Sequence, residues 1–371
     1  MNVWSWGANS YGQLAQGDTD DRLVPKPIGT VPGRLTRISC GGGHTLLLTE
    51  DGRVYVCGCN NKGQLGTCYL QNFAIFTALQ KIKERVVDIA GGWDFSLAVT
   101  DTGSLYAWGS NAFGQLGDPS LQAITPVPTQ INIPCQVIQV AAGLRHTVAL
   151  LVSGEVYCWG HAKKGQCGQQ GESRLPLKLD LPSKVEITPH NYKCTQIVAG
   201  SYHSAALTAQ GSVLFWGCNK HGQGAVYPKV TQQISVPMVI DQDLFGGERV
   251  KVIKSGWTHL LAQTESGLVY SWGRGDYGQL GRSRSPDIDH IPGVMDISEK
   301  ITQLECGSEH NLLLTETGRL YAVGWNEHGL CGTGDETNVE RPTPIATLST
   351  TTVQYIACGG GHCFAVTTDY G

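Results

Sequence analysis

The hydrophobic pattern of this chain consists of short runs that suit β-strands and not helices. Leu35–Ile38 alternates apolar and polar residues, and a glycine-rich turn then leads into the strongly apolar run His44–Thr49. A period of two is typical of a half-buried strand, and an apolar run of this length indicates a buried one. A turn at Asp51-Gly52 then leads into Val54–Cys57, which predicts a hairpin.

Proline-containing segments, such as Val127–Ile131 and Val236–Ile240, precede these alternating runs in several places. Proline cannot donate a hydrogen bond to a neighbouring strand, so these segments are predicted to be edge strands. Each stretch of the chain therefore offers about four strands, and no long amphipathic helix pattern interrupts them.

A ten-residue motif, found as WGSNAFGQLG at Trp108–Gly117, recurs along the chain. The glycine at its second position is Gly7, Gly58, Gly109, Gly160, Gly217, Gly273 and Gly324 in the seven copies, so successive copies lie 51 to 57 residues apart. A repeat of this length is one supersecondary unit that needs neighbours to bury its core. Seven four-stranded units predict an all-β fold, a single seven-bladed β-propeller spanning residues 1–371.

The two ends of the chain complement each other. The last unit ends at His362–Thr367 without a final strand, while Val3–Trp6 is a strand that stands alone. We therefore expect the N-terminal strand to complete the C-terminal blade and to close the ring, which leaves few open strand edges. Two units are longer than the others, and their extra residues in 169–196 and 225–249 are predicted to form protruding loops.

Composition and motifs narrow the classes of function. The net charge is −4, only 16% of residues are charged, and no basic tail is present, so direct nucleic-acid binding is not expected. No apolar run reaches the ~20 residues of a membrane span, so membrane insertion is not expected. The sequence contains no Walker, H-E-x-x-H or G-x-S-x-G motif, so we expect no covalent catalysis, no catalytic residue, no metal site and no cofactor. The thirteen cysteines mostly occupy repeat positions, and together with the absence of a signal peptide they indicate a reducing, intracellular compartment.

Six histidines occupy one position of the repeat, and Phe95 takes that position in the second unit. They are His44, His146, His203, His259, His310 and His362. A catalytic base would not be repeated around a ring or replaced by phenylalanine. We therefore expect these rings to pack between blades, with the N–H satisfied by backbone.

The two residues between the glycine and this histidine break the repeat, and in the propeller they lie on one face around the channel mouth. We call this surface, formed by residues 42–43, 93–94, 144–145, 201–202, 257–258, 308–309 and 360–361, the turn face. Its aromatic and charged residues are typical of a protein-binding hot spot. The predicted partner-binding residues are Trp93, Asp94, Arg145, Tyr202, Trp257, Thr258 and Glu309. The alternative is that these side chains only pack on neighbouring loops.

The combination of G-x-x-H with W-G-x-N-x-x-G-Q-L-G resembles the regulator of chromosome condensation family of seven-bladed propellers. The resemblance covers the whole chain and includes Gly7–Leu14, Ala142–His146, Ser255–His259 and Gly324–Gly329. These stretches are most similar to a member linked to secretion and to the exocyst tethering complex. The resemblance implies a monomeric, cytoplasmic and partly nuclear regulator whose partner is a small GTPase or an exocyst subunit, with guanine nucleotide exchange as an activity.

A noncatalytic adaptor is the alternative. In the chromatin-bound member of the family, exchange uses a wedge hairpin after the W-G of the unit corresponding to Trp108, and acidic and histidine residues on the turn face. Here the loop after Trp108 is regular, and Trp93, Arg145 and Thr258 occupy the corresponding positions. A third reading, a plant ultraviolet-B receptor of this fold, needs clustered tryptophans stacked with arginines. Because Trp93 and Trp257 lie three units apart, we do not expect such a cluster.

Overall fold

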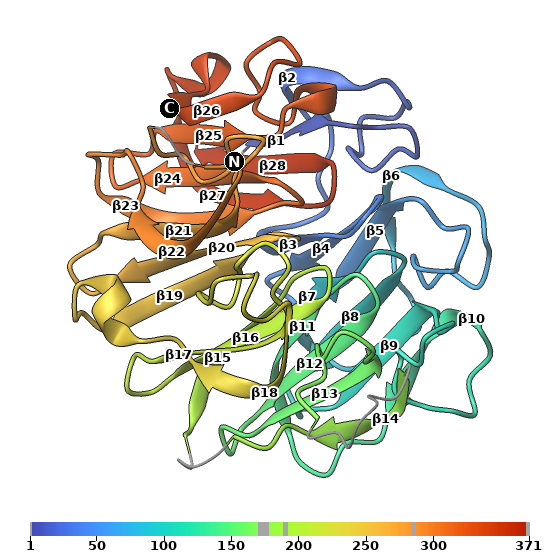
Figure 1. Cartoon of the computed structure of the whole chain (residues 1–371). Helices are drawn as coiled ribbons and strands as arrows, with labels where there is room; N and C mark the ends of the chain where they lie inside the picture. The colour runs from blue at the N-terminus through green and yellow to red at the C-terminus, as the bar shows by residue number, and fades with distance from the viewer. Residues whose placement is uncertain (1, 170–177, 188–191, 284–285, 369–371) are drawn as a thin grey trace.

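The computed structural model describes residues 2–169, 178–187, 192–283 and 286–368. Within them, seven four-stranded antiparallel sheets are arranged as blades around a central axis (Figure 1). The second and third strands of a blade pair through a tight turn, as the hairpin signals predicted, a longer loop leads to the fourth strand, and the three 3₁₀ turns are short. The predicted seven-bladed β-propeller is confirmed. No helix in the described part of the chain has the length and apolar character that a bilayer crossing requires.

Each of the first six blades uses four consecutive strands, numbered outward from the axis. Blade 1 contains β3 (Leu35–Cys40), β4 (His44–Thr49), β5 (Val54–Gly58) and β6 (Phe73–Ala78), and blade 2 contains β7 (Val86–Gly91), β8 (Phe95–Thr100), β9 (Leu105–Ser110) and β10 (Ile124–Ile131). Blade 3 contains β11 (Val137–Ala142), β12 (His146–Leu151), β13 (Val156–His161) and β14 (Lys178–Lys184), and blade 4 contains β15 (Cys194–Ala199), β16 (His203–Thr208), β17 (Val213–Cys218) and β18 (Gln233–Val239). Blade 5 contains β19 (Val250–Ser255), β20 (His259–Thr264), β21 (Val269–Arg274) and β22 (Ile288–Val294), and blade 6 contains β23 (Ile301–Cys306), β24 (His310–Thr315), β25 (Leu320–Gly324) and β26 (Val339–Pro344).

Blade 7 joins the two ends of the described chain. Its strand order is β27 (Thr352–Cys358), β28 (His362–Thr368), β1 (Asn2–Gly7) and β2 (Arg22–Pro27). Strand β1 pairs with β28 from Asn2↔Thr367 to Gly7↔His362, which confirms that the N-terminal strand completes the C-terminal blade. The N-terminal segment also supplies the outer strand β2, so this blade is built from two strands of each end.

In five of the seven blades, a buried tryptophan joins the blade to the preceding one, whereas Cys57 and Val323 take this position in blades 1 and 6. Trp108 Nε1 donates to the backbone oxygen of Gln64 at 2.8 Å, and Trp159 Nε1 donates to that of Gln115 at 3.0 Å. Leu116, next to Gln115, is fully buried between the blades. The Gly-Gln-Leu-Gly turn therefore docks under the tryptophan of the next blade, and it positions the loop that follows on the turn face.

Glycine is required at the end of the third strand of the blade. Gly109 has φ +106°, and a Cβ there would lie 2.6 Å from the Cα of Phe95 on the paired strand. A larger residue would push this strand away from its neighbour, which explains why the W-G step recurs in the motif.

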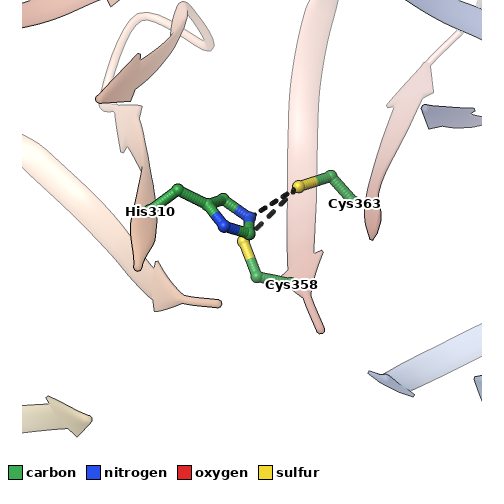
Figure 2. A group of neighbouring side chains, drawn as sticks. All are labelled: His310, Cys358 and Cys363. Atoms are coloured by element: carbon green, nitrogen blue, oxygen red, sulfur yellow. Dashed lines mark hydrogen bonds between the residues drawn. The ribbon is translucent and has the colours of Figure 1, made fainter. Parts of the chain in front are cut away.

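The repeated histidines pack between blades as expected, but their partners are side chains and not backbone. The Nε2 atoms contact residues of the next blade in the pairs His44–Ser96, His146–Ser204, His203–Ser255, His259–Asn311, His310–Cys363 and His362–Thr45, at 2.7 to 3.1 Å. The expectation of a backbone partner was wrong because the neighbouring strand presents a small polar side chain at this depth. Figure 2 shows the pair His310–Cys363. Burial lowers the pKa of His44 to about 4 and that of His146 to about 3, so both are neutral near pH 7.

The longer units differ from the prediction of simple protruding loops. In the 225–249 segment, the outer strand β18 is followed by a 3₁₀ turn at Gln242–Phe245. Phe245 is buried and contacts Tyr270 and Trp272 edge-on, at ring-centroid distances of 5.5 and 5.6 Å. The extra residues therefore fill space between blades 4 and 5. Residues 170–177 and 188–191 of the other predicted loop lie outside the described residues.

Candidate protein-binding site

The turn face surrounds the mouth of the central channel, because the innermost strand of every blade ends there. The cavity at this mouth is lined by the strand ends of all seven blades, including Gly42, Trp93, Leu144, Trp257 and Ser308. Its volume is about 90 Å³, whereas pockets for small molecules usually measure roughly 300–1,000 Å³. The channel has room for a few water molecules, so the surface around it suits a macromolecular partner better than a small ligand.

Trp93 and Trp257 meet at the channel mouth. Their ring centroids lie 5.3 Å apart at an interplanar angle of 61°, and 43% of Trp93 is exposed. No cluster of tryptophans stacked with arginines was expected because the two residues lie three units apart; that reason was wrong, since the turns of all blades converge at the axis. Arg or Lys side chains over aromatic rings occur, among the described residues, at Phe113, Tyr227 and Tyr277 and not at either tryptophan. The two tryptophans therefore form an aromatic contact, without the stacked arginines that the ultraviolet-B receptor hypothesis requires.

Arg145 and Tyr202 belong to a second aromatic group, over blades 2 to 4. The Arg145 guanidinium lies 4.3 Å from the ring centroid of Phe113. The ring of His161 lies between Phe113 and Tyr202, at 5.4 and 5.7 Å from their centroids. A cation held over an aromatic face is favourable by about 0.5–1 kcal/mol at an exposed site, and this contact orients the guanidinium.

Asp94 lies beside this group. Burial raises the pKa of its carboxyl, and the hydrogen bond with Ser110 and the nearby charge of Arg145 act in the opposite direction. Burial also lowers the pKa of His161, with the Arg145 charge as a second cause. The positive charge of Arg145 therefore acts to lower the pKa of both Asp94 and His161 in this cluster.

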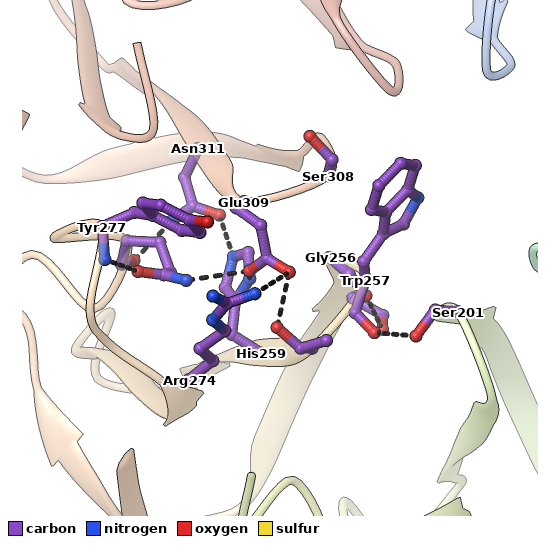
Figure 3. Close-up of polar contacts among 12 residues, drawn as sticks. Ser201, Gly256, Trp257, His259, Arg274, Tyr277, Ser308, Glu309 and Asn311 are labelled. Atoms are coloured by element: carbon purple, nitrogen blue, oxygen red, sulfur yellow. Dashed lines mark hydrogen bonds and ion pairs between the residues drawn. The ribbon is translucent and has the colours of Figure 1, made fainter. Parts of the chain in front are cut away.

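Glu309 is the centre of a polar network between blades 5 and 6 (Figure 3). Only 5% of this residue is exposed. Its carboxylate accepts hydrogen bonds from Thr258 Oγ1 at 2.6 Å and from Gln279 Nε2 at 2.8 Å, and Arg274 Nη1 lies 3.9 Å away. A buried carboxylate with two donors and a nearby guanidinium is well compensated, so Glu309 and Thr258 hold the turns in place.

The backbone of Trp257 is fixed from both sides of its turn. Its N–H donates to the oxygen of Ser308 at 2.8 Å, and its own oxygen accepts from Ser201 Oγ at 2.7 Å. Three consecutive blades therefore hold the indole at the channel mouth (Figure 3).

The structure thus divides the predicted residues into three groups. Trp93 and Trp257 form one group, Asp94, Arg145 and Tyr202 form the second, and Thr258 with Glu309 forms the third. Sequence reasoning missed Phe113, His161, Arg274 and Tyr277, which stand on the loop that begins at the W-G motif. The signal was available, because the pairing His44↔Gly58 brings that loop to the same end of the blade as the turn face.

Comparisons with known proteins agree with this architecture. Residues 2–365 match the model of the RCC1-like domain. The chain is 38% identical to the mouse secretion-regulating guanine nucleotide exchange factor over 98% of this chain and 83% of that protein. It is 34% identical to the ultraviolet-B receptor UVR8 of Arabidopsis thaliana, over 77% of this chain and 64% of the receptor.

A solved structure supports the fold independently. The crystal structure of Prp20p from Saccharomyces cerevisiae, described with its binding to Gsp1p and histones, superposes with a TM-score of 0.87. The match covers 100% of this chain and 92% of that chain at 24% identity, which bears on the fold alone. With a family model that matches nearly every residue and a curated relative 38% identical along its length, the chain belongs to the RCC1-like domain family.

Proposed function

We propose that this protein regulates secretion by binding a small GTPase through the turn face and promoting release of its guanine nucleotide. The observation that carries the proposal is the 38% identity to the secretion-regulating guanine nucleotide exchange factor, which extends over 98% of this chain. The partner is a small GTPase or a subunit of the exocyst, and the working compartment is the cytoplasm, with a nuclear fraction.

The composition of the turn face supports this role. Trp93 and Trp257 offer apolar area at the centre of the face, and Arg145 offers a charge that Phe113 orients. Aromatic and arginine side chains at the centre of a surface provide most of the affinity in typical protein interfaces. No covalent chemistry is required, since exchange needs only tighter binding to the nucleotide-free GTPase than to the loaded one.

Nucleotide release from a panel of purified small GTPases loaded with a fluorescent guanine nucleotide tests the proposal. We expect faster release from at least one GTPase, and Trp93→Ala, Arg145→Ala and Trp257→Ala should each slow it. Val152→Ala is a matched control, because Val152 is exposed in the hairpin turn at the opposite end of blade 3. Release no faster than the blank over the panel would rule out exchange.

A noncatalytic adaptor is the second candidate, and one observation favours it. The loop from 111 to 123, between β9 and β10, contains no extra strand, and it is similar in length to the corresponding loops 59–72 and 219–232. A wedge that could enter a nucleotide site is therefore missing at this position among the described residues. The adaptor predicts equal affinity for the loaded and nucleotide-free GTPase, or capture of an exocyst subunit, which the same alanine variants weaken while Val152→Ala does not.

A further inference from the structure

Three side chains that can bind a soft metal ion meet where blade 6 contacts the closing blade. His310 begins β24, Cys358 ends β27 and Cys363 lies on β28 (Figure 2). Their ligand atoms all lie within 4.8 Å of one another. His310 Nε2 is 3.1 Å from Cys363 Sγ, and the two sulfur atoms are 3.9 Å apart.

The contact differs from its counterparts in the other blades. In the other blades that carry it, the repeated histidine contacts a hydroxyl or amide oxygen of the following blade, as at Ser96 and Ser204. Here the partner is a thiol, and a second thiol stands directly across the strand pair, since Cys358 and Cys363 are register partners. In the described part of the chain, His310, Cys358 and Cys363 are the one set of three or more His, Cys, Asp or Glu side chains whose ligand atoms come together.

We propose that His310, Cys358 and Cys363 form a binding site for Zn²⁺ that ties blade 6 to the closing blade. Zinc–sulfur bonds of about 2.3 Å at tetrahedral angles place two sulfur atoms about 3.8 Å apart, close to the observed separation. The same geometry places sulfur and nitrogen about 3.6 Å apart, so His310 Nε2 and Cys363 Sγ must separate by about 0.5 Å. Thiolate and imidazole are the ligands that zinc prefers in proteins.

Charge favours a divalent ion over a monovalent one. Two thiolates and a neutral imidazole carry two negative charges, which Zn²⁺ neutralises, whereas Cu⁺ would leave a net negative charge in a buried place. His310 and Cys363 are fully buried. Binding releases one proton from each thiol to solvent, and no oxidant or reductant takes part.

The central channel gives the ion a way in. Cys358 is only partly buried, and it lines the channel cavity together with Cys306 and Cys40 of the neighbouring blades. The ion can thus enter from the channel mouth, and a water molecule from the channel can take the fourth tetrahedral position.

Titration of the reduced, chelator-treated protein with Co²⁺, followed by Zn²⁺, tests the proposal. We expect the absorption of a cobalt–thiolate complex to saturate at one equivalent and to disappear on addition of one equivalent of Zn²⁺. We also expect Zn²⁺ to raise the thermal unfolding midpoint. Cys363→Ser and Cys358→Ala should weaken binding by more than about 100-fold, because even residues behind the ligands typically cost 10–100-fold.

The variants are chosen to keep the fold. Serine stands at the position of Cys363 in blades 2 and 4, and alanine stands at the position of Cys358 in blades 3 and 4. Cys306→Ser is the matched control, since Cys306 is the equivalent of Cys358 in blade 6, outside the converging group, and its substitution should leave binding unchanged. An unmodified protein without cobalt–thiolate absorption, or folded Cys363→Ser and Cys358→Ala variants that bind as well as it does, would overturn the proposal.

Discussion

The buried histidines make the stability of the ring depend on pH, and His146→Phe measures the effect of one of them. His146 is fully buried between blades 3 and 4. Burial lowers its pKa from 6.5 to about 3, with the neighbouring His161 as a second cause. Phenylalanine fits this position, because Phe95 occupies it in blade 2. Ser204, which loses its imidazole partner in the variant, keeps its hydrogen bond to the backbone oxygen of Gln166 at 2.9 Å.

The direction of the pH effect on stability follows from the unfolded and folded pKa values of His146. Because the folded pKa of His146 is lower than the unfolded one, its stabilising effect is present above about pH 6.5 and is lost as the pH falls toward the folded value. At about pH 5 the unfolded chain binds a proton that the folded chain does not. Linkage then makes this one histidine lower the free energy of unfolding by about 2 kcal/mol relative to about pH 7.5. The figure changes little for any folded pKa below about 4, because the unfolded value dominates at this pH.

Urea unfolding of the unmodified protein and of His146→Phe at about pH 7.5 and about pH 5 provides the measurement. Loss of the imidazole–hydroxyl contact costs about 1 kcal/mol at both pH values, so only the difference between the two pH values is informative. We expect the unmodified protein to lose about 2 kcal/mol more than the variant on acidification. An equal loss in the two proteins would mean that His146 titrates normally in the fold, and the argument from burial would be refuted.

Three further perturbations test the packing of the ring. Deletion of residues 2–7 removes the partner of β28, and we expect loss of the cooperative thermal transition of the whole protein, whereas a change confined to one end in hydrogen exchange would count against closure. Arg37→Met leaves the buried carboxylate of Asp88 without its ion-pair partner and should cost about 1–3 kcal/mol in urea unfolding, part of which Asp88→Asn recovers. Gly143→Ala places a Cβ 2.2 Å from the imidazole of its own turn and should cost about 1–3 kcal/mol, whereas Gly29→Ala, in open space, should be close to neutral in the same assay.

The repeat made the architecture predictable, because every unit has the same turn and strand signals and most units also have the tryptophan. It also predicted closure by β1, although β2 joined the same blade as an additional outer strand. The sequence did not reveal which side chains satisfy the histidines. Those partners belong to the next unit and differ in type, as Ser96, Asn311 and Cys363 show. A pattern search within one unit cannot detect a contact between two units.

The candidate site was predictable in its location and less so in its internal contacts. Residues that interrupt the repeat were expected on one face, and the structure places them there. The distance between Trp93 and Trp257 was misjudged, because separation around the ring was taken as separation in space. At the central axis of a propeller the turns of all blades converge, so side chains from blades three apart can be in contact. Burial of Glu309 could not be inferred either, since it depends on Gln279 and Thr258 from two other turns.

The shared closing blade has a consequence for how the protein is made. Asn2 of β1 pairs with Thr367 of β28, so the first strand leaves the ribosome long before its partner strand has been synthesised. During synthesis the nascent propeller has the form of an open arc, in which the edge of β1 that will face β28 and the edge of the newest blade are both unpaired. Such edges can recruit strands of other chains, so aggregation is most favoured during this interval.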